Sequence, residues 1–352
     1  MSRTQGDPEE GGRSMEYVLL GRTGVRVSPL CLGTMNFGLR TPASEAERIL
    51  NRAREAGINF IDTADVYGAG DNRTSASGVG ESERIIGAWL ARSGLRDRLV
   101  LATKAFFPTD PSDPNAGGAS RRHILRACEE SLVRLGTDRI DLFQLHWPSA
   151  EVPLDETLRA LEDLVRAGKV LYVGTSNFDP WKIVEALWIA SDLRLHRVVS
   201  EQAPYSMVCR AAERYLLPMA NRHHVAVLAW SPLWGGFLTG KYRAGEPFPD
   251  GSRFTMDLPL WAIWKNRMEP AAFDLLGHLD AIAVRHGRSV SQIALGWTLR
   301  RPGITALVIG PRTVEQLEDN LAALSVELDE SDLSIIDCHA PPGRALVRPL
   351  PA

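Results

Sequence analysis

The chain has few cysteines and no long apolar segment. Because its four cysteines are widely separated, no Cys-x-x-Cys pair indicates a zinc site or a disulfide framework; they are Cys31, Cys128, Cys209 and Cys338. No hydrophobic run is long enough to span a bilayer. The first fourteen residues, MSRTQGDPEEGGRS, lack the apolar core of a secretory signal. We therefore expect no metal, no disulfide and a cytoplasmic location.

An excess of charge of either sign is also missing. Lys and Arg together number 40 and Asp and Glu 43, for a formal net charge of −3. This balance gives no reason to expect nucleic acid or an anionic membrane as a partner. With 44% hydrophobic and 24% charged residues, the composition is that of a globular protein. We expect a disordered tail over 1–14, a single domain over 15–345 and a short tail over 346–352.

Strand and helix signals alternate along nearly the whole chain. Short β-branched segments lie at 27–33, 58–62, 99–104, 140–146, 170–176, 197–202, 225–231 and 305–310. Amphipathic helical segments separate them, one of which we expect to open with a capping box at Ser44 and Glu47. Apolar strands joined by helical crossovers predict a parallel sheet covered on both faces.

Eight such strands favour a (β/α)₈ TIM barrel, α/β in class, with long loops at its C-terminal face. A doubly wound sheet is the alternative, and it requires a Gly-rich turn straight after an early strand. The nearest candidate, GVGESE at 78–83, lacks the third glycine and the preceding strand. The barrel is therefore the favoured fold.

Polar side chains stand where the predicted strands end. They are Asp62, Lys104, His146, Ser176, Asn177, Gln202 and Ser231, with Gly310 after the last strand. In a barrel these ends converge on one mouth, where active sites form. Tyr67 follows its strand closely enough to fold back over that mouth. The set lacks the paired carboxylates of a retaining glycosidase, and its single imidazole does not match a metal-dependent hydrolase.

Six segments carry a family resemblance. FIDTADVYG, LATKAF, IDLFQLHWP, VGTSNF, WSPLWGGFLTGKY and VIGPRTVEQLEDN occur in this order. They resemble the successive signatures of the aldo-keto reductase family, from about residue 17 to about residue 328. The resemblance implies a barrel that binds NADP(H) without a Rossmann fold and reduces aldehydes and ketones, with catalytic residues Asp62, Tyr67, Lys104 and His146.

The chemistry of these four residues is consistent with that role. Carbonyl reduction needs a proton for the developing alkoxide, and an unperturbed tyrosine, with a pKa of about 10, exchanges protons poorly near neutrality. A lysine beside Tyr67 would favour the phenolate, provided that Asp62 keeps the lysine ionised. His146 would donate to the substrate oxygen. Asp65 is left over, and we expect it to cap the loop or the following turn rather than to take part in catalysis.

The resemblance also implies a set of cofactor contacts. Ser176, Asn177 and Gln202 would hold the nicotinamide carboxamide, and the loop from Ser231 would close over the pyrophosphate. Arg312 precedes a helix N-terminus, where a guanidinium suits a 2′-phosphate; Gly310 replaces a basic residue found in many members. Gln316 could serve the adenosine or cap the helix with Thr313. The full predicted set is Thr34, Met35, Asp62, Ser176, Asn177, Gln202, Tyr205, Ser231, Pro232, Leu233, Gly235, Leu238, Lys241, Arg253, Gly310, Arg312, Gln316, Asp319 and Asn320.

Aromatic residues near the strand ends are candidates for a substrate pocket. We expect substrate contacts from Phe37, Tyr67, His146 and Trp147, with Trp234, Trp261 and Trp264 as further candidates that could equally pack under loops. Such walls are consistent with apolar or cyclic carbonyl compounds. The long polar stretch at 68–82 could be a lid or a disordered excursion.

Two other functions stay open at this stage. Some barrels of this family associate with potassium channels and use the cofactor chiefly as a sensor, and this reading predicts slow turnover. A dehydratase or lyase could use the same tyrosine on a sugar-like substrate. The leading hypothesis remains an NADPH-dependent reductase whose partner is a small carbonyl compound, with the oligomeric state left open.

Overall fold

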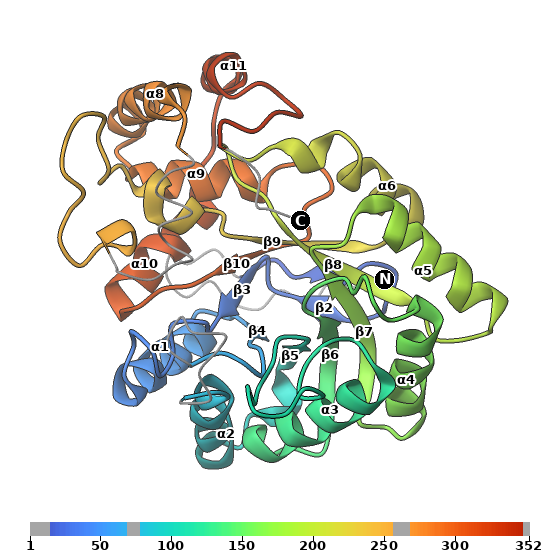
Figure 1. The fold of residues 1–352 in the computed structure, drawn as a ribbon. Helices are drawn as coiled ribbons and strands as arrows, with labels where there is room; N and C mark the ends of the chain where they lie inside the picture. Colours follow the sequence, from blue (N-terminus) through green and yellow to red (C-terminus); the bar gives the residue numbers. More distant parts are fainter. Residues whose placement is uncertain (1–14, 69–77, 256–267, 348–352) are drawn as a thin grey trace, which may run out of the picture.

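The computed structural model describes residues 15–68, 78–255 and 268–347, and its centre is a closed barrel of eight parallel strands (Figure 1). Around the barrel the strands follow the order β10-β3-β4-β5-β6-β7-β8-β9. They are β3 (Leu30–Gly33), β4 (Phe60–Asp62), β5 (Val100–Ala105), β6 (Ile140–Leu145), β7 (Val170–Ser176), β8 (Val198–Pro204), β9 (Ala226–Trp230) and β10 (Ala306–Ile309). The predicted TIM barrel is confirmed.

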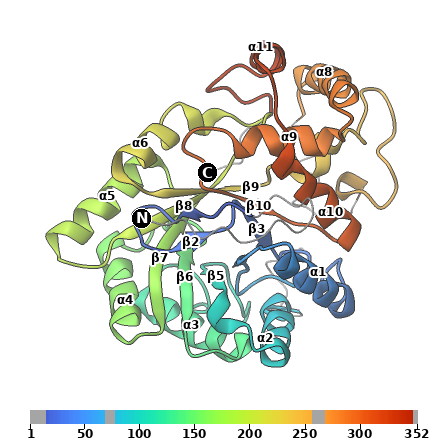
Figure 2. The same ribbon diagram turned by 180° about the vertical axis from the view of Figure 1, so that it is seen from behind.

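Helices surround the barrel on its outer side (Figure 2). They are α1 (Ala43–Glu55), α2 (Glu81–Ser93), α3 (Arg121–Leu135), α4 (Leu154–Arg166), α5 (Pro180–Asp192), α6 (Leu216–His223), α8 (Pro270–His286), α9 (Val290–Leu299), α10 (Val314–Ala322) and α11 (Glu330–His339). Short 3₁₀ turns lie at η1 (Arg96–Arg98), η2 (Ala211–Glu213), η3 (Trp234–Thr239), η4 (Arg253–Thr255) and η5 (Ala323–Ser325). None of the helices in the described ranges is long and apolar enough to cross a membrane.

The first predicted strand divides in two. Arg26 and Val27 form β2, which pairs antiparallel with β1 (Val18–Leu19), and β3 starts only at Leu30. Pro29 stands between them and has no N–H to donate to a strand ladder, which explains the break. The predicted capping box was also misplaced, because α1 begins at Ala43 with Pro42 at its N-cap and no side-chain cap.

The antiparallel pair β1–β2 covers one end of the barrel, and the predicted polar site residues gather at the other end. Leu20 and Val27 pack with the apolar side chains that fill the barrel's lower interior, among them Phe60 and Leu142. Each strand therefore runs from an apolar layer towards its C-terminal end, where the chemistry-bearing residues lie. A second, larger core lies between the strands and the helices.

The structure describes only part of the predicted tails and of the predicted loop at 68–82. Residues 1–14 and 348–352 lie outside the described part of the chain, as does 69–77 within the predicted loop at 68–82. At the other end, Leu346 donates its N–H to the Val208 carbonyl, and Val347 is buried. The first two residues of the predicted C-terminal tail thus pack on the barrel.

Candidate active site

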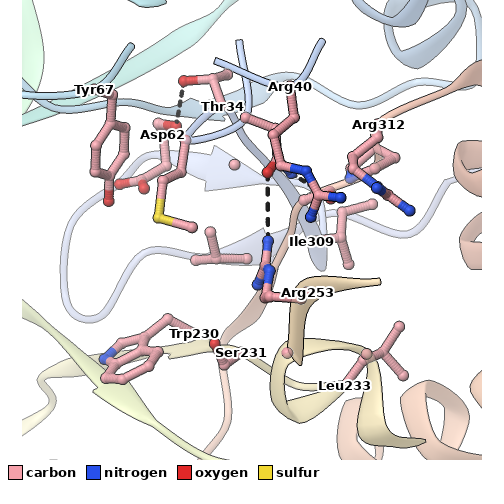
Figure 3. Close-up of a pocket in the computed structure, with 18 of the residues that line it drawn as sticks. Thr34, Arg40, Asp62, Tyr67, Trp230, Ser231, Leu233, Arg253, Ile309 and Arg312 are labelled. Carbon is pink, nitrogen blue, oxygen red and sulfur yellow. Dashed lines mark hydrogen bonds between the residues drawn. The ribbon is translucent and has the colours of Figure 1, made fainter. Parts of the chain in front are cut away.

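A cavity of about 630 Å³ opens at the carboxyl ends of the strands (Figure 3). Most of the predicted site residues line it: Thr34, Met35, Asp62, Tyr67, His146, Trp147, Ser176, Asn177, Gln202, Ser231, Pro232, Leu233, Gly235, Lys241, Arg253, Gly310, Arg312, Gln316, Asp319 and Asn320. Side chains from strands far apart in the sequence are thus brought together around one space.

A chain of hydrogen bonds runs from the end of β4 to that of β5. Lys104 Nζ donates to Asp62 Oδ2 at 2.6 Å, to the Thr63 carbonyl at 2.7 Å and to the Tyr67 hydroxyl at 3.2 Å. Lys104 is completely buried, whereas Tyr67 reaches the cavity. The tyrosine hydroxyl is therefore the end of the chain that a small molecule could contact.

The electrostatics keep this lysine charged. Burial by itself would lower the pKa of Lys104, but the charge of Asp62, the nearby Tyr67 and the hydrogen bonds to both outweigh it, so this pKa lies above its ordinary value. The Lys104 ammonium also lies 4.7 Å from the centre of the Tyr67 ring. A fixed positive charge is thus held beside the phenol.

Two glutamines hold the second oxygen of Asp62. Gln144 Nε2 donates to Oδ1 at 3.0 Å and Gln202 Nε2 donates to the same atom at 2.8 Å. Gln144 was not singled out in the sequence analysis. This residue lies on β6, two positions before His146, and its side chain points into the barrel towards Asp62. In register it lies beside Lys104. Gln202, which was predicted from the sequence to contact the carboxamide, thus donates to the Asp62 carboxylate.

His146 lies at the mouth between two aromatic rings. Its ring meets the Tyr67 ring edge-on at 5.7 Å between centroids, and the Phe107 ring at 4.9 Å. Its backbone N–H donates to the Ala105 carbonyl at 3.1 Å, which continues the sheet beyond β6. The histidine and tyrosine side chains consequently line the same part of the cavity.

Strained backbone marks two of the strand ends. Asn177 after β7 has φ 62° and Ser231 after β9 has φ 53°, a left-handed conformation that costs non-glycine residues free energy. Asn177 Nδ2 donates to the His146 carbonyl at 3.2 Å, and Asn177 Oδ1 accepts from Trp230 Nε1 at 3.2 Å. These bonds hold Asn177 at the cavity wall beside His146.

Four cationic residues line the opposite end of the cavity, and three of them are labelled in Figure 3: Arg40, Arg253 and Arg312, with Lys241 as the fourth. Burial, followed by the charges of Arg312, Arg253 and Arg40, lowers the pKa of Lys241 to about 8. Burial and Arg312 likewise lower the pKa of Arg40. Positive charges that repel one another in this way would be stabilised by a bound anion. Arg40 was missed because it lies in the loop after β3, away from the recognised motifs.

Hydrogen bonds tie the loops around this cation cluster together. Arg253 Nη2 donates to Asn36 Oδ1 at 3.3 Å, and Arg40 Nη2 donates to the Gly251 carbonyl at 2.7 Å. Asn36 Nδ2 in turn donates to the Gly310 carbonyl at 2.9 Å. The segment after β9 thus crosses the cavity and reaches the loop after β3.

Polar side chains of α10 have hydrogen-bond partners within the protein. Thr313 Oγ1 accepts from the Gln316 N–H at 3.3 Å, while Gln316 Oε1 accepts from the Arg312 N–H at 2.9 Å. Asp319 accepts from Ser289 Oγ at 2.8 Å and from Gln292 Nε2 at 2.8 Å. Of these side chains on α10, Gln316 and Asp319 also line the cavity.

Three predicted contacts do not reach the cavity. Phe37 and Leu238 are fully buried in the core between strands and helices. Tyr205 is buried too: its hydroxyl donates to Glu213, and its ring stacks on Trp297 at 6.0 Å. All three follow strand ends but point towards the helices.

The structure describes some of the remaining residues that were singled out in the sequence analysis. Trp234 is buried, and Trp261 and Trp264 lie outside the described residues. Asp65 is fully buried, and burial followed by the charge of Glu83 raises its pKa well above the ordinary range. Among the described residues, no three His, Cys, Asp or Glu side chains lie close enough to hold a metal.

Comparison with known proteins places this arrangement in a family. The model of the aldo/keto reductase family matches residues 29–341. An uncharacterized oxidoreductase, YrpG, of Bacillus subtilis is 44% identical over 330 residues, covering 92% of this chain and 95% of its own. Protein tas of Escherichia coli is 34% identical over 343 residues, 92% and 97% of the two chains.

A third relative is named after an ion channel. A probable voltage-gated potassium channel subunit beta of Arabidopsis thaliana is 33% identical over 319 residues, 89% of this chain and 92% of its own. The family match spans the whole barrel, and the hydrogen-bonded Asp62, Lys104 and Tyr67 stand at its mouth. The chain belongs to the aldo/keto reductase family.

Proposed function

We propose that this protein is an NADPH-dependent reductase that converts aldehydes or ketones to alcohols. One observation carries the proposal: a buried, charged Lys104 is hydrogen-bonded both to Asp62 and to a tyrosine hydroxyl that reaches the cavity. A structural ion pair would need no phenol at its open end. The same tyrosine lines the cavity beside His146, so a carbonyl oxygen could meet both side chains.

The residues divide the proton chemistry between them. Tyr67 acts as the general acid and gives its proton to the developing alkoxide. The adjacent Lys104 ammonium stabilises the phenolate left behind, by roughly 4 kcal/mol for a cation at about 4 Å and an effective dielectric of about 20. Asp62, held by Gln144 and Gln202, fixes the lysine. His146 orients the carbonyl oxygen towards the tyrosine.

The opposite end of the cavity fits a phosphorylated dinucleotide. Arg40, Lys241, Arg253 and Arg312 supply positive charge for the pyrophosphate and the 2′-phosphate, and guanidinium groups bind phosphate bidentately. Ser176 and Asn177 lie near His146, where they would hold the carboxamide. When bound, NADPH would supply the hydride. The cluster of cations favours NADPH over NADH.

A fluorescence titration with NADPH and NADH, followed by turnover of a simple aromatic aldehyde, tests the proposal. We expect tighter binding of NADPH than of NADH, and consumption of NADPH that depends on the aldehyde. Absence of binding to either nucleotide would refute the cofactor assignment. Binding without turnover across a panel of aldehydes and ketones would refute the reductase assignment alone.

Binding of NADPH without turnover would favour a second function, that of a protein that senses the cofactor. The observation behind this alternative is the 33% identity to a protein named as a probable potassium channel subunit beta. A sensor would bind NADPH tightly and turn it over very slowly, so the turnover rate separates the two functions. The intact chain from Asp62 to Tyr67 supports the reductase. The cytoplasmic location stays a prediction.

A further inference from the structure

Charge is unevenly distributed along the cavity. Its basic side chains gather at the nucleotide end, and its acidic residues there, Glu315 and Asp319, belong to α10. Near Tyr67 the one charged lining residue among those described is Asp62, whose carboxylate is already bonded to Lys104 and the two glutamines. Apart from the His146 imidazole, the described lining of the reactive end therefore offers no cationic side chain to pair with a negatively charged substrate.

Aromatic rings form much of the wall at this reactive end. From Tyr67 the ring of His146 lies at 5.7 Å, and from His146 the ring of Phe107 lies at 4.9 Å. Phe107 in turn lies 6.3 Å from Trp147. All four rings line the cavity, and Val79 and Pro108 add aliphatic surface. The contacts between His146 and its two neighbours are edge-on, the arrangement that aromatic pairs prefer.

We propose that the reactive end takes an uncharged carbonyl compound with a flat apolar group, and that Phe107 selects it and positions His146. This inference rests on the proposed reductase function. The Phe107 ring does two things at once: one part supports the imidazole, and another faces the cavity. Phe37 was predicted from the sequence to contact the substrate; in the structure Phe37 is buried in the core, and Phe107 lines the cavity instead.

The apolar wall should affect the choice of substrate, and the contact between Phe107 and His146 should affect the rate. Moving a carboxylate from water into a wall of rings without a partner costs free energy, so a charged substrate should react more slowly than its neutral counterpart. A planar apolar group gains by leaving water and by packing against Phe107 and Trp147. Loosening His146 should lower the rate for every carbonyl compound, because orientation of the reacting group contributes to catalysis.

A matched pair of substrates tests the charge preference. The methyl ester of para-formylbenzoic acid and the free para-formylbenzoate differ by a charge and a methyl group at the far side of the same ring, and the ratio of their rates with borohydride in solution corrects for their different intrinsic reactivity. With saturating NADPH, we expect kcat/KM for the ester to exceed that for the acid by at least about tenfold. Equal values, or a preference for the acid, would overturn this inference and leave the reductase function standing. No turnover of any aldehyde would overturn both.

A pair of variants tests Phe107. Phe107→Leu should lower kcat/KM for the aromatic ester by about tenfold or more, and should also lower kcat for a small aliphatic aldehyde because His146 is loosened. Phe106→Leu is the matched control: this ring lies 5.6 Å from Phe107 but does not line the cavity. NADPH affinity should stay the same in both. Equal losses in the two variants, or no loss in Phe107→Leu, would overturn the assignment.

Discussion

The ammonium of Lys104 donates to the carboxylate of Asp62 across 2.6 Å, and both side chains are almost completely removed from solvent. Burying two charges costs free energy that their attraction offsets only when the remaining polar atoms are also hydrogen-bonded. Here Gln144 and Gln202 satisfy the second carboxylate oxygen. Because well-packed hydrophobic residues often stabilise a fold as much as a buried ion pair does, the hydrogen bond from Lys104 to Tyr67 points to a role for the pair beyond stability.

Separating structure from function at this pair requires two variants. Lys104→Met should lower the free energy of unfolding by about 3–5 kcal/mol, because Asp62 is left as an uncompensated buried charge. Adding Asp62→Asn should recover most of this stability without recovering turnover. Denaturant unfolding and NADPH-dependent aldehyde reduction measure the two effects. A double variant that regained activity would contradict the role given to Lys104.

The tyrosine gives the most direct test of the proton donor. Tyr67→Phe removes one hydroxyl and keeps the ring that packs against His146. We expect turnover to fall by about a hundredfold or more, the usual contribution of a general acid, while NADPH binding is unchanged. Steady-state kinetics and a fluorescence titration check both. A variant that kept more than about a tenth of the activity would show that another group supplies the proton.

The sequence was sufficient to predict the barrel for a physical reason. Short apolar strands alternate with helical segments through all eight repeats, and most of the predicted polar residues lie at the carboxyl end of a strand or just beyond it. It failed where one residue changes the outcome locally: Pro29 separates β2 from β3, and Pro42 rather than Ser44 precedes α1. Such details depend on a single missing N–H or on one cap.

The site was less predictable than the fold. Residues that end strands were placed correctly at the cavity, because a barrel forces strand ends together. Gln144, Arg40 and Phe107 were missed, since each acts through neighbours distant in the chain. Conversely, Tyr205 follows a strand but faces Trp297. Side-chain direction in loops depends on tertiary packing that the local pattern does not encode.

The arginine before α10 should decide between the two nucleotides. Arg312→Ala should weaken NADPH binding by about tenfold to a hundredfold, as expected for loss of a charge-assisted hydrogen bond, and should weaken NADH binding much less. Arg40→Ala should act in the same direction, because Arg40 lines the same cavity and its charge, like that of Arg312, acts on Lys241. Titrations with both nucleotides provide the comparison. Equal weakening for NADPH and NADH would move the 2′-phosphate site elsewhere.

Cofactor binding should also depend on pH through Lys241. Burial and the charges of Arg312, Arg253 and Arg40 lower the pKa of this lysine to about 8, so in the free protein it loses its charge as the pH rises through that value. A bound phosphate would favour the ammonium, and binding would then take up a proton. NADPH affinity should therefore be greatest below pH 8 and fall as the pH rises, by at most about tenfold per pH unit for one linked proton.

Lys241→Gln isolates this effect. The variant should bind NADPH more weakly near pH 7, where the lysine is charged, and should lose most of the pH dependence between about pH 7 and pH 9. Dissociation constants measured across that range at constant ionic strength make the comparison, because added salt would screen the same charges. If the variant and the parent protein showed the same slope, the proton would be taken up by another group and Lys241 would not contact the phosphates.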